Sequence, residues 1–241
     1  MRRSLFLLAT LAMSSALYAQ PDASTYNREK VLDIFAQYNP AVLENAKKNA
    51  DYNAILEDLA ASYQAPDTED ARFELISVAR NFDNSIRLHT LAEQYEEALF
   101  LSAVNGVDAS ATDKYFNRQV ADVLGRVWAV TVNLREEQVK EYKKQLAQVK
   151  KDKNLSSADR TAKSNALKAK IKAVKAELKA LKKDPGSQIS TAAQAFGQQV
   201  QTRVQARLSA LAASAEKDAA MQTAQTSNLQ VKTNHKKPVA K

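Results

Sequence analysis

The residues of this chain best suited to a specific chemistry are the lysines concentrated after its middle. Residues 135–183 contain 16 Lys and Arg but only 6 Asp and Glu. A lysine ammonium is a compact, strongly hydrated point charge with several hydrogen-bond donors, so a cluster of them suits an anionic partner. We take ten of these lysines as candidate anion- or partner-binding residues: Lys143, Lys144, Lys150, Lys151, Lys163, Lys168, Lys170, Lys172, Lys175 and Lys179.

Few other residues could support catalysis or bind a metal. The chain has no cysteine, and its only two histidines are His89 and His235. His89, Glu93 and Glu96 share one face of an expected helix, but Ile86 stands where a Glu-x-x-His site of a helical bundle needs a glutamate. A glycine-rich phosphate loop and a nucleophile elbow are also missing from the sequence. We therefore expect no enzyme activity, no catalytic residue, no metal and no cofactor.

The composition predicts an all-α fold. The chain has 4 Gly and 5 Pro in 241 residues, and the prolines fall in polar, turn-like contexts. Between them Ala, Leu, Lys, Glu and Gln dominate, which are residues of high helix propensity. Apolar periodicity predicts helices over 27–38, 40–63 and 68–104, with a possible break near 81–84. A long helix follows from residue 110 to the turn "KNLSSAD", a return helix from that turn to "KDPGS" at 183–187, and a last helix over about 189–221.

The basic segment is predicted to form an antiparallel helical hairpin. Apolar residues recur three or four positions apart on both sides of the polar turn "KNLSSAD", which is typical of a coiled-coil seam. If the turn is centred near Ser156 and Ser157, the two apolar rows match in register, so that Val139 meets Val174. The seam then consists of Val139, Tyr142, Leu146, Val149, Leu167, Ile171, Val174, Leu178 and Leu181.

The lysines flank this seam, where coiled coils usually pair opposite charges. Towards the tip of the hairpin lysine meets lysine or glutamine, and only Glu136 and Glu137 near the base are placed to neutralise any of them. Three explanations stay open. The lysines could simply be the solvated side of an alanine-rich arm. They could instead bind an anionic partner, or form the polar side of a helix at a membrane interface.

The first residues, "MRRSLFLLATLAMSSALYAQ", have the layout of a secretory signal peptide. Arg2 and Arg3 precede an apolar stretch, and cleavage is expected after Ala19; a retained N-terminal anchor is the alternative. We therefore expect a secreted protein, located in the periplasm if the host is Gram-negative. No other apolar run approaches the roughly 20 residues that cross a bilayer, so no transmembrane segment is expected after cleavage.

These patterns divide the chain into five parts. Residues 20–134 hold 18 Asp and Glu against 10 Lys and Arg, so an acidic body precedes the basic hairpin. We expect a helical body from which the antiparallel coiled-coil arm protrudes. The parts are a signal peptide (1–19), the acidic helical body (20–134), the basic hairpin (135–183), a C-terminal helix packing on the body (184–222) and a disordered basic tail (223–241).

In overall plan, the signal peptide and the hairpin from Arg135 to Lys183 resemble the small periplasmic chaperones of the Skp/OmpH type. These are exported basic proteins whose helical hairpin arms hold unfolded outer-membrane proteins, so the resemblance implies chaperone-like binding of client proteins. It is architectural only. The mature chains of that family begin with a β-strand, whereas the corresponding stretch of this chain, "QPDASTYNREK", is polar and shows no strand pattern. The family also lacks the helical body that we expect here over residues 27–104.

The sequence therefore favours an exported, chaperone- or adaptor-like binding protein that is not an enzyme. Its lysine-rich arm would engage anionic envelope components or client proteins. The alternative is a structural envelope protein, a homo-oligomer in which the basic arm of one copy docks on the acidic body of another. Nucleic acid is not expected as a partner, because the protein is exported and no aromatic residues interleave the lysines to stack on bases.

Overall fold

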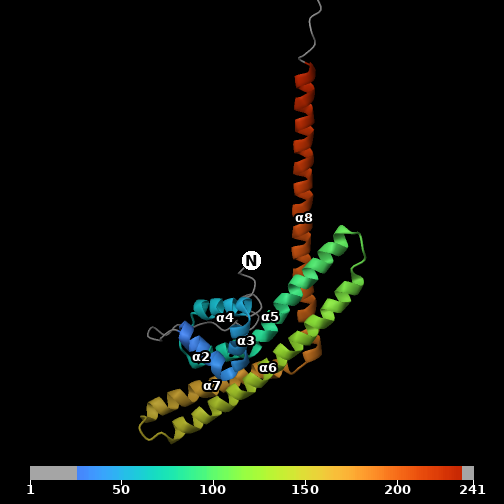
Figure 1. Cartoon of the computed structure of the whole chain (residues 1–241). Coiled ribbons are helices and arrows are strands. Elements are labelled where there is room, and N and C mark those ends of the chain that lie inside the picture. Colours follow the sequence, from blue (N-terminus) through green and yellow to red (C-terminus); the bar gives the residue numbers. More distant parts are fainter. Residues whose placement is uncertain (1–25, 235–241) are drawn as a thin grey trace, which may run out of the picture. The chain divides into compact units, whose positions relative to one another are not determined.

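The computed structural model describes residues 26–234, with side chains as far as residue 215. Within that range every regular element is a helix, which confirms the all-α prediction. The expected signal peptide (1–19) and the end of the expected tail (235–241) lie outside the described residues. The helices are α2 (Arg28–Tyr38), α3 (Pro40–Lys48), α4 (Ala50–Ser62), α5 (Glu69–Val104), α6 (Ser110–Lys151), α7 (Ser157–Leu181) and α8 (Pro185–Asn234) (Figure 1).

The chain divides into two compact units, which we describe separately. Unit 1 runs as far as Leu91 and also includes Arg118–Ala193. Unit 2 consists of Ala92–Asn117 and the chain from Gln194 onward. The hairpin predicted over residues 135–183 falls entirely within unit 1.

The core of unit 1 joins α2, α3 and α4 to the first half of α5. Val31, Phe35, Leu56 and Leu75 are almost completely buried there, and the ring of Phe82 meets that of Phe35 edge to face at 5.4 Å. Burying a side chain of this size contributes about 1.5–3 kcal/mol. The periodic apolar residues of four short helical segments therefore form one core.

Two helix boundaries differ from the sequence prediction. The segment 40–63 is two helices, because Asn49 is extended at φ −137° and its side chain accepts a hydrogen bond from the Tyr52 amide, starting α4. The break expected near 81–84 is absent, and α5 is continuous. Asn81 is buried within it, where its backbone oxygen accepts from the Ser85 hydroxyl and its side chain accepts from Asn84. These polar groups are satisfied within the helix and do not interrupt it.

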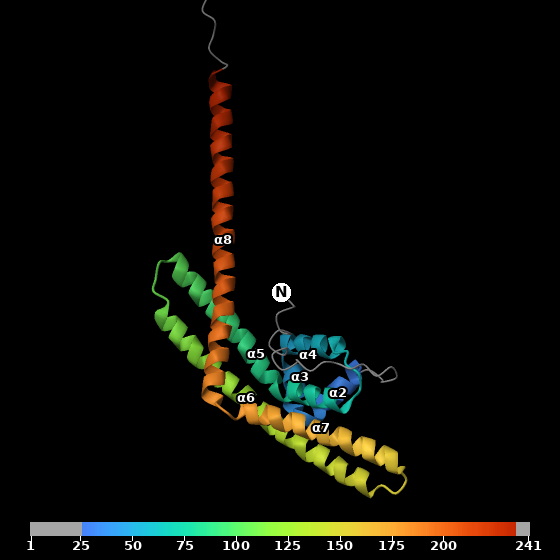
Figure 2. The same cartoon turned by 180° about the vertical axis from the view of Figure 1, so that it is seen from behind.

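Helices α6 and α7 lie side by side as an antiparallel pair joined by a short turn (Figures 1 and 2). The Ser156 hydroxyl caps α7 by accepting from the Asp159 amide at 3.0 Å. The Arg160 guanidinium reaches back to donate to the carbonyl oxygens of Asp152 and Leu155. The turn therefore forms where "KNLSSAD" predicts it, with both helix ends partly capped.

A small cluster of apolar side chains holds the two helices together. Val139, Tyr142 and Val174 are buried in it, with Leu167 and Ile171 partly buried around them. The cluster also contains Phe73 of α5, whose ring centroid lies 6.0 Å from that of Tyr142. Part of the hairpin therefore belongs to a three-helix contact, which the sequence did not predict. The remaining seam residues are all half-buried: Leu146, Val149, Leu178 and Leu181.

Unit 2 is built from the end of α5, the start of α6 and most of α8. Tyr95 is buried and stacks on Phe116 at 4.9 Å, and its hydroxyl donates to Asp113. Arg207 of α8 pairs with Glu96 and Glu97 of α5. Helix α8 continues to Asn234, beyond residue 222 where the sequence analysis ends it. The chain has no glycine or proline between residues 198 and 237 that would stop it.

Candidate anion-binding face of the hairpin

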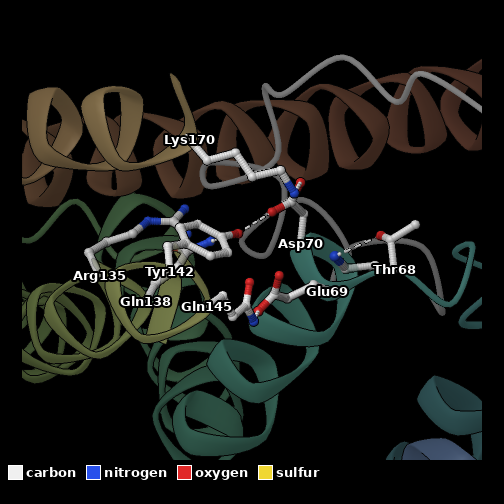
Figure 3. Close-up of polar contacts among 9 residues, drawn as sticks. Thr68, Glu69, Asp70, Arg135, Gln138, Tyr142, Gln145 and Lys170 are labelled. Atoms are coloured by element: carbon white, nitrogen blue, oxygen red, sulfur yellow. Dashed lines mark hydrogen bonds and ion pairs between the residues drawn. The ribbon is translucent and has the colours of Figure 1, made fainter. Parts of the chain in front are cut away.

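The acidic first turn of α5 lies against one flank of the hairpin (Figure 3). The Asp70 carboxylate accepts hydrogen bonds from the Tyr142 hydroxyl of α6 and, at 2.9 Å, from the Lys170 ammonium of α7. Glu69 beside it accepts from the Gln145 side chain. One turn of α5 is thus bound to both helices of the pair.

This contact continues as a chain of polar groups along the same flank. Gln138 is buried, donates to the Tyr142 hydroxyl at 3.0 Å and accepts from Arg135 at 2.9 Å. Arg135 in turn pairs with Glu177 of α7 at 3.2 Å. The Lys170 ammonium also lies 5.3 Å from the centroid of the Tyr142 ring, within cation–π range. Buried polar groups need such partners, so this network fixes α5, α6 and α7 together.

The titration of this network follows from its burial and its charges. Burial raises the pKa of the Tyr142 hydroxyl, and the hydrogen bond to Asp70 raises it further, so the hydroxyl stays protonated and donates. Partial burial raises the pKa of Asp70, but the hydrogen bonds from Tyr142 and Lys170 outweigh it and leave that pKa below the ordinary value. The Asp70 side chain is 56% exposed, so solvent screens part of its attraction to Lys170.

The opposite flank of the hairpin starts with a similar ion pair and then changes character. At the base, the Lys182 ammonium lies 2.5 Å from a Glu136 carboxylate oxygen. A helical position recurs nearly every seven residues, so stepping one heptad towards the tip replaces this pair by Lys143 and Lys175. A second step gives Lys150 and Lys168. The position at the base therefore holds one carboxylate and one ammonium group, whereas each of the two equivalent positions nearer the tip holds two lysines.

These four lysines belong to a larger basic surface, which we call the lysine face. Successive residues of an α-helix are about 100° apart around the helix axis. The Glu136–Lys182 contact marks one flank and the Tyr142–Lys170 contact marks the other, so the flank of every other position on α6 and α7 follows from its spacing to these residues. All members of the lysine face are exposed or nearly so, and within residues 26–215 none has a carboxylate within ion-pair distance. The members are Lys143, Lys150, Lys168, Lys172, Lys175 and Lys179.

The other four candidate lysines lie elsewhere. Lys170 forms an ion pair with Asp70 on the α5 flank, so it lies outside the lysine face. Lys144 and Lys151 are on the side of α6 turned away from α7, with Lys144 4.0 Å from Glu141. Lys163 lines a cavity near the turn. The structure therefore gathers six of the ten candidates on one face.

The cavity near the turn has a volume of about 420 Å³ and lies on the flank opposite the lysine face, alongside Gln145. Val149, Leu155 and Leu167 form its apolar wall, and Lys163 and Asp152 stand at its edge. It lies between the ends of α6 and α7, where the apolar cluster of the hairpin stops. The lysine face therefore carries its charge on a surface that this cavity does not interrupt.

Trp128, the single tryptophan of the chain, has a structural position. The Trp128 indole donates to the Leu181 carbonyl oxygen at 3.3 Å, which joins α6 to the end of α7. Among the described residues, no group of three or more His, Asp or Glu side chains is arranged to hold a metal ion. Over the same residues, no helix combines the length and the apolar character needed to cross a membrane.

Searches against protein-family models, curated proteins and solved structures each find no match for this chain. Its function is therefore inferred from its own residues and contacts.

The network at Asp70 was missed by the sequence analysis. In the sequence, Glu69 and Asp70 have only the pattern of acids that favour the start of a helix, and they do stand in the first turn of α5. One signal for the contact was present. Tyr142 occupies a seam position, and a buried tyrosine hydroxyl needs a hydrogen-bond partner that the predicted hairpin alone does not supply.

Replacing Tyr142 by phenylalanine tests the network. Tyr142→Phe keeps the ring but leaves the buried Gln138 amide without its acceptor, so the free energy of unfolding should fall by about 1–3 kcal/mol. Urea unfolding followed by circular dichroism measures this. Tyr115→Phe is the matched control, because Tyr115 is 60% exposed and its loss of a hydroxyl should change stability by less than about 0.5 kcal/mol. Equal effects of the two changes would contradict the network.

The lowered pKa of Asp70 predicts a pH dependence. Its folded pKa lies below the unfolded value of about 3.9, so its stabilising contribution is present above that value and is lost as pH falls through the folded pKa. Wild type should be more stable than Asp70→Asn at pH 7, and the difference should shrink below about pH 4. Burial raises the pKa of Glu74 in both proteins, and the Asp70 charge raises it further in the wild type only, so Glu74 contributes to the difference in the opposite sense. A difference that stays constant down to pH 3 would rule out this role for the Asp70 charge.

Proposed function

We propose that this chain is a non-enzymatic binding protein whose lysine face engages an anionic partner, either an envelope component or a client protein. One observation carries the proposal. By heptad spacing, Lys143 with Lys175 and Lys150 with Lys168 occupy positions equivalent to those of the Glu136–Lys182 ion pair. On this flank a glutamate neutralises a lysine only at the base of the hairpin, where Glu136 pairs with Lys182.

The energetics favour an external counter-charge without requiring one for folding. Repulsion between exposed lysines costs well under about 1 kcal/mol for each pair, so the hairpin tolerates it. Several such charges on one face nevertheless add up to a positive potential that attracts an anion over a distance of roughly 10 Å at physiological ionic strength. A binding face of this kind costs little stability and gains affinity and association rate.

The distribution of acids in unit 1 also supports the proposal. The acidic start of α5 carries Glu69 and Asp70, and both are bound on the flank away from the lysine face. The two carboxylates that α5 brings to the hairpin therefore lie on one flank, and the lysine face lies on the other. Export, which the N-terminal sequence pattern predicts, would place the partner among the polyanions of the cell envelope.

A neutralised lysine face tests this function. Glutamine has a helix propensity close to that of lysine, so changing six lysines to Gln should keep the fold and lower the affinity at least about tenfold. Binding is measured by co-sedimentation with phosphatidylglycerol vesicles, lipopolysaccharide and an unfolded acidic polypeptide, at low and high salt. The changed residues are Lys143, Lys150, Lys168, Lys172, Lys175 and Lys179.

The matched control changes six other exposed lysines to Gln, so that it loses the same amount of charge. It should bind nearly as tightly as wild type does. If the lysine-face variant binds every probe as tightly as the control, the proposed function is wrong. The control residues are Lys47, Lys48, Lys114, Lys144, Lys151 and Lys153.

A second function is supported by the acidic composition of residues 20–134, on which the lysine face of another copy could dock. Such an assembly would form at low salt and dissociate as salt is added, because exposed charge pairs are screened. Light scattering of wild type across a salt series distinguishes the two functions. A monomer at all salt concentrations is the result expected for binding to an external partner, and a low-salt oligomer that the neutralised variant fails to form supports self-assembly.

A further inference from the structure

The lysine face contains two repeated units that are more specific than its total charge. Lys143 with Lys175, and Lys150 with Lys168, occupy the positions that Glu136 and Lys182 occupy at the base. At the base, a carboxylate oxygen lies 2.5 Å from the ammonium group. Each of the two lysine pairs has the same helical positions but lacks the anion, so an anionic group supplied from outside can sit between two ammonium groups.

The spacing of the two pairs follows from the helix. Seven residues at about 1.5 Å per residue place the pairs roughly 10 Å apart along the hairpin. A ligand that fills both must therefore present at least two anionic groups at about that separation. A single small anion would fill only one pair.

The residue type indicates how the anions are held. Every charged residue of the lysine face is lysine, and none is arginine. Arginine offers a rigid planar fork that reads one carboxylate or phosphate in one orientation, whereas lysine is a point charge on a flexible stem. Lysine pairs therefore suit phosphate groups whose orientation varies from one to the next.

The shape of the surroundings indicates a surface as the partner. The lysine face spans α6 and α7, which lie side by side in Figure 2. The cavity near the turn is on the other flank. The large exposed apolar side chains among the described residues are all in unit 2, and none is in the hairpin. An unfolded client would need apolar contacts as well as charge. Val139, Tyr142 and Val174 are buried between the helices, and the apolar wall of the cavity is on the other flank, so the lysine face has no apolar residues with which to insert.

We propose that the Lys143–Lys175 and Lys150–Lys168 pairs are two clamps for the phosphate groups of an anionic lipid surface. The hairpin would lie along the headgroups with its lysine face towards them, bound peripherally and not inserted. This inference rests on the proposed function and names its partner. A lysine close to an anionic membrane strengthens binding by about fivefold, so the four clamp lysines together account for a several-hundred-fold preference over a neutral membrane.

The test reverses charge within the clamps. Lys143→Glu with Lys150→Glu puts a carboxylate opposite Lys175 and Lys168, as Glu136 stands opposite Lys182. Urea unfolding should show this variant to be at least as stable as wild type, so that any loss of binding does not come from unfolding. Its partitioning onto vesicles of phosphatidylcholine mixed with phosphatidylglycerol should fall at least about 30-fold.

The control reverses two neighbouring charges on the same helix. Lys144→Glu with Lys151→Glu changes the net charge by the same amount, on the side of α6 turned away from α7. Its partitioning should fall less than about fivefold, and neither protein nor wild type should bind vesicles of phosphatidylcholine alone. Equal losses in both variants would overturn the clamps while leaving a generally basic binding surface intact.

Two further outcomes test the choice of partner. If wild type binds soluble polyphosphate or poly-glutamate but not the phosphatidylglycerol vesicles, the lipid surface is wrong although the proposed function stands. If wild type binds none of these anions, both the inference and the proposed function fail. Binding to the mixed vesicles that only the clamp variant loses supports the inference.

Discussion

The hydrogen bond from Tyr142 to Asp70 determines which flank of the hairpin is free. Tyr142 is completely buried, so its hydroxyl needs a partner, and the first turn of α5 supplies one. Phe73, one turn further along α5, packs on the same ring, so apolar and polar contacts reinforce each other there. Once α5 occupies this flank, Lys170 is neutralised, and the other flank keeps a group of unpaired lysines, the lysine face.

The two flanks illustrate how one heptad pattern serves two purposes. On the α5 flank, Arg135 pairs with Glu177 and Lys170 pairs with Asp70, so each charge is used within the fold. On the opposite flank the only such pair of the described residues is that of Lys182 with Glu136 at the base, and no member of the lysine face is paired. Helical packing fixes the position of every one of these side chains, while the choice of residue at each step decides whether a charge stabilises the fold or stays available.

Local signals predicted much of the structure. The helices follow from the composition and the apolar spacing, and the turn of the hairpin follows from the cap at Ser156, because such signals lie within a few residues of the feature they specify. The boundary at Asn49 was missed because asparagine is also tolerated within helices, as Asn81 shows. The excess of lysine was visible too, although its division between two flanks was not.

The Asp70 contact could not be predicted by such reasoning. Asp70 and Tyr142 are 72 residues apart, and neither belongs to a pattern that names the other. From the sequence alone, nothing distinguishes Lys170 from Lys168 or Lys172, which are lysines of the same helix. The sequence therefore predicts which residues form the arm, whereas tertiary packing selects which of its lysines are available.

Residue-resolved amine labelling measures this selection most directly. Acetylation of the free protein, followed by mass spectrometry of its peptides, gives the reactivity of each lysine. Lys170, which pairs with Asp70 and stacks on Tyr142, should react several-fold more slowly than Lys168, Lys172 and Lys175 on the same helix, because a bonded ammonium must dissociate before it reacts. If Lys170 reacts as fast as these three neighbours, α5 does not occupy that flank and the asymmetry of the hairpin is contradicted.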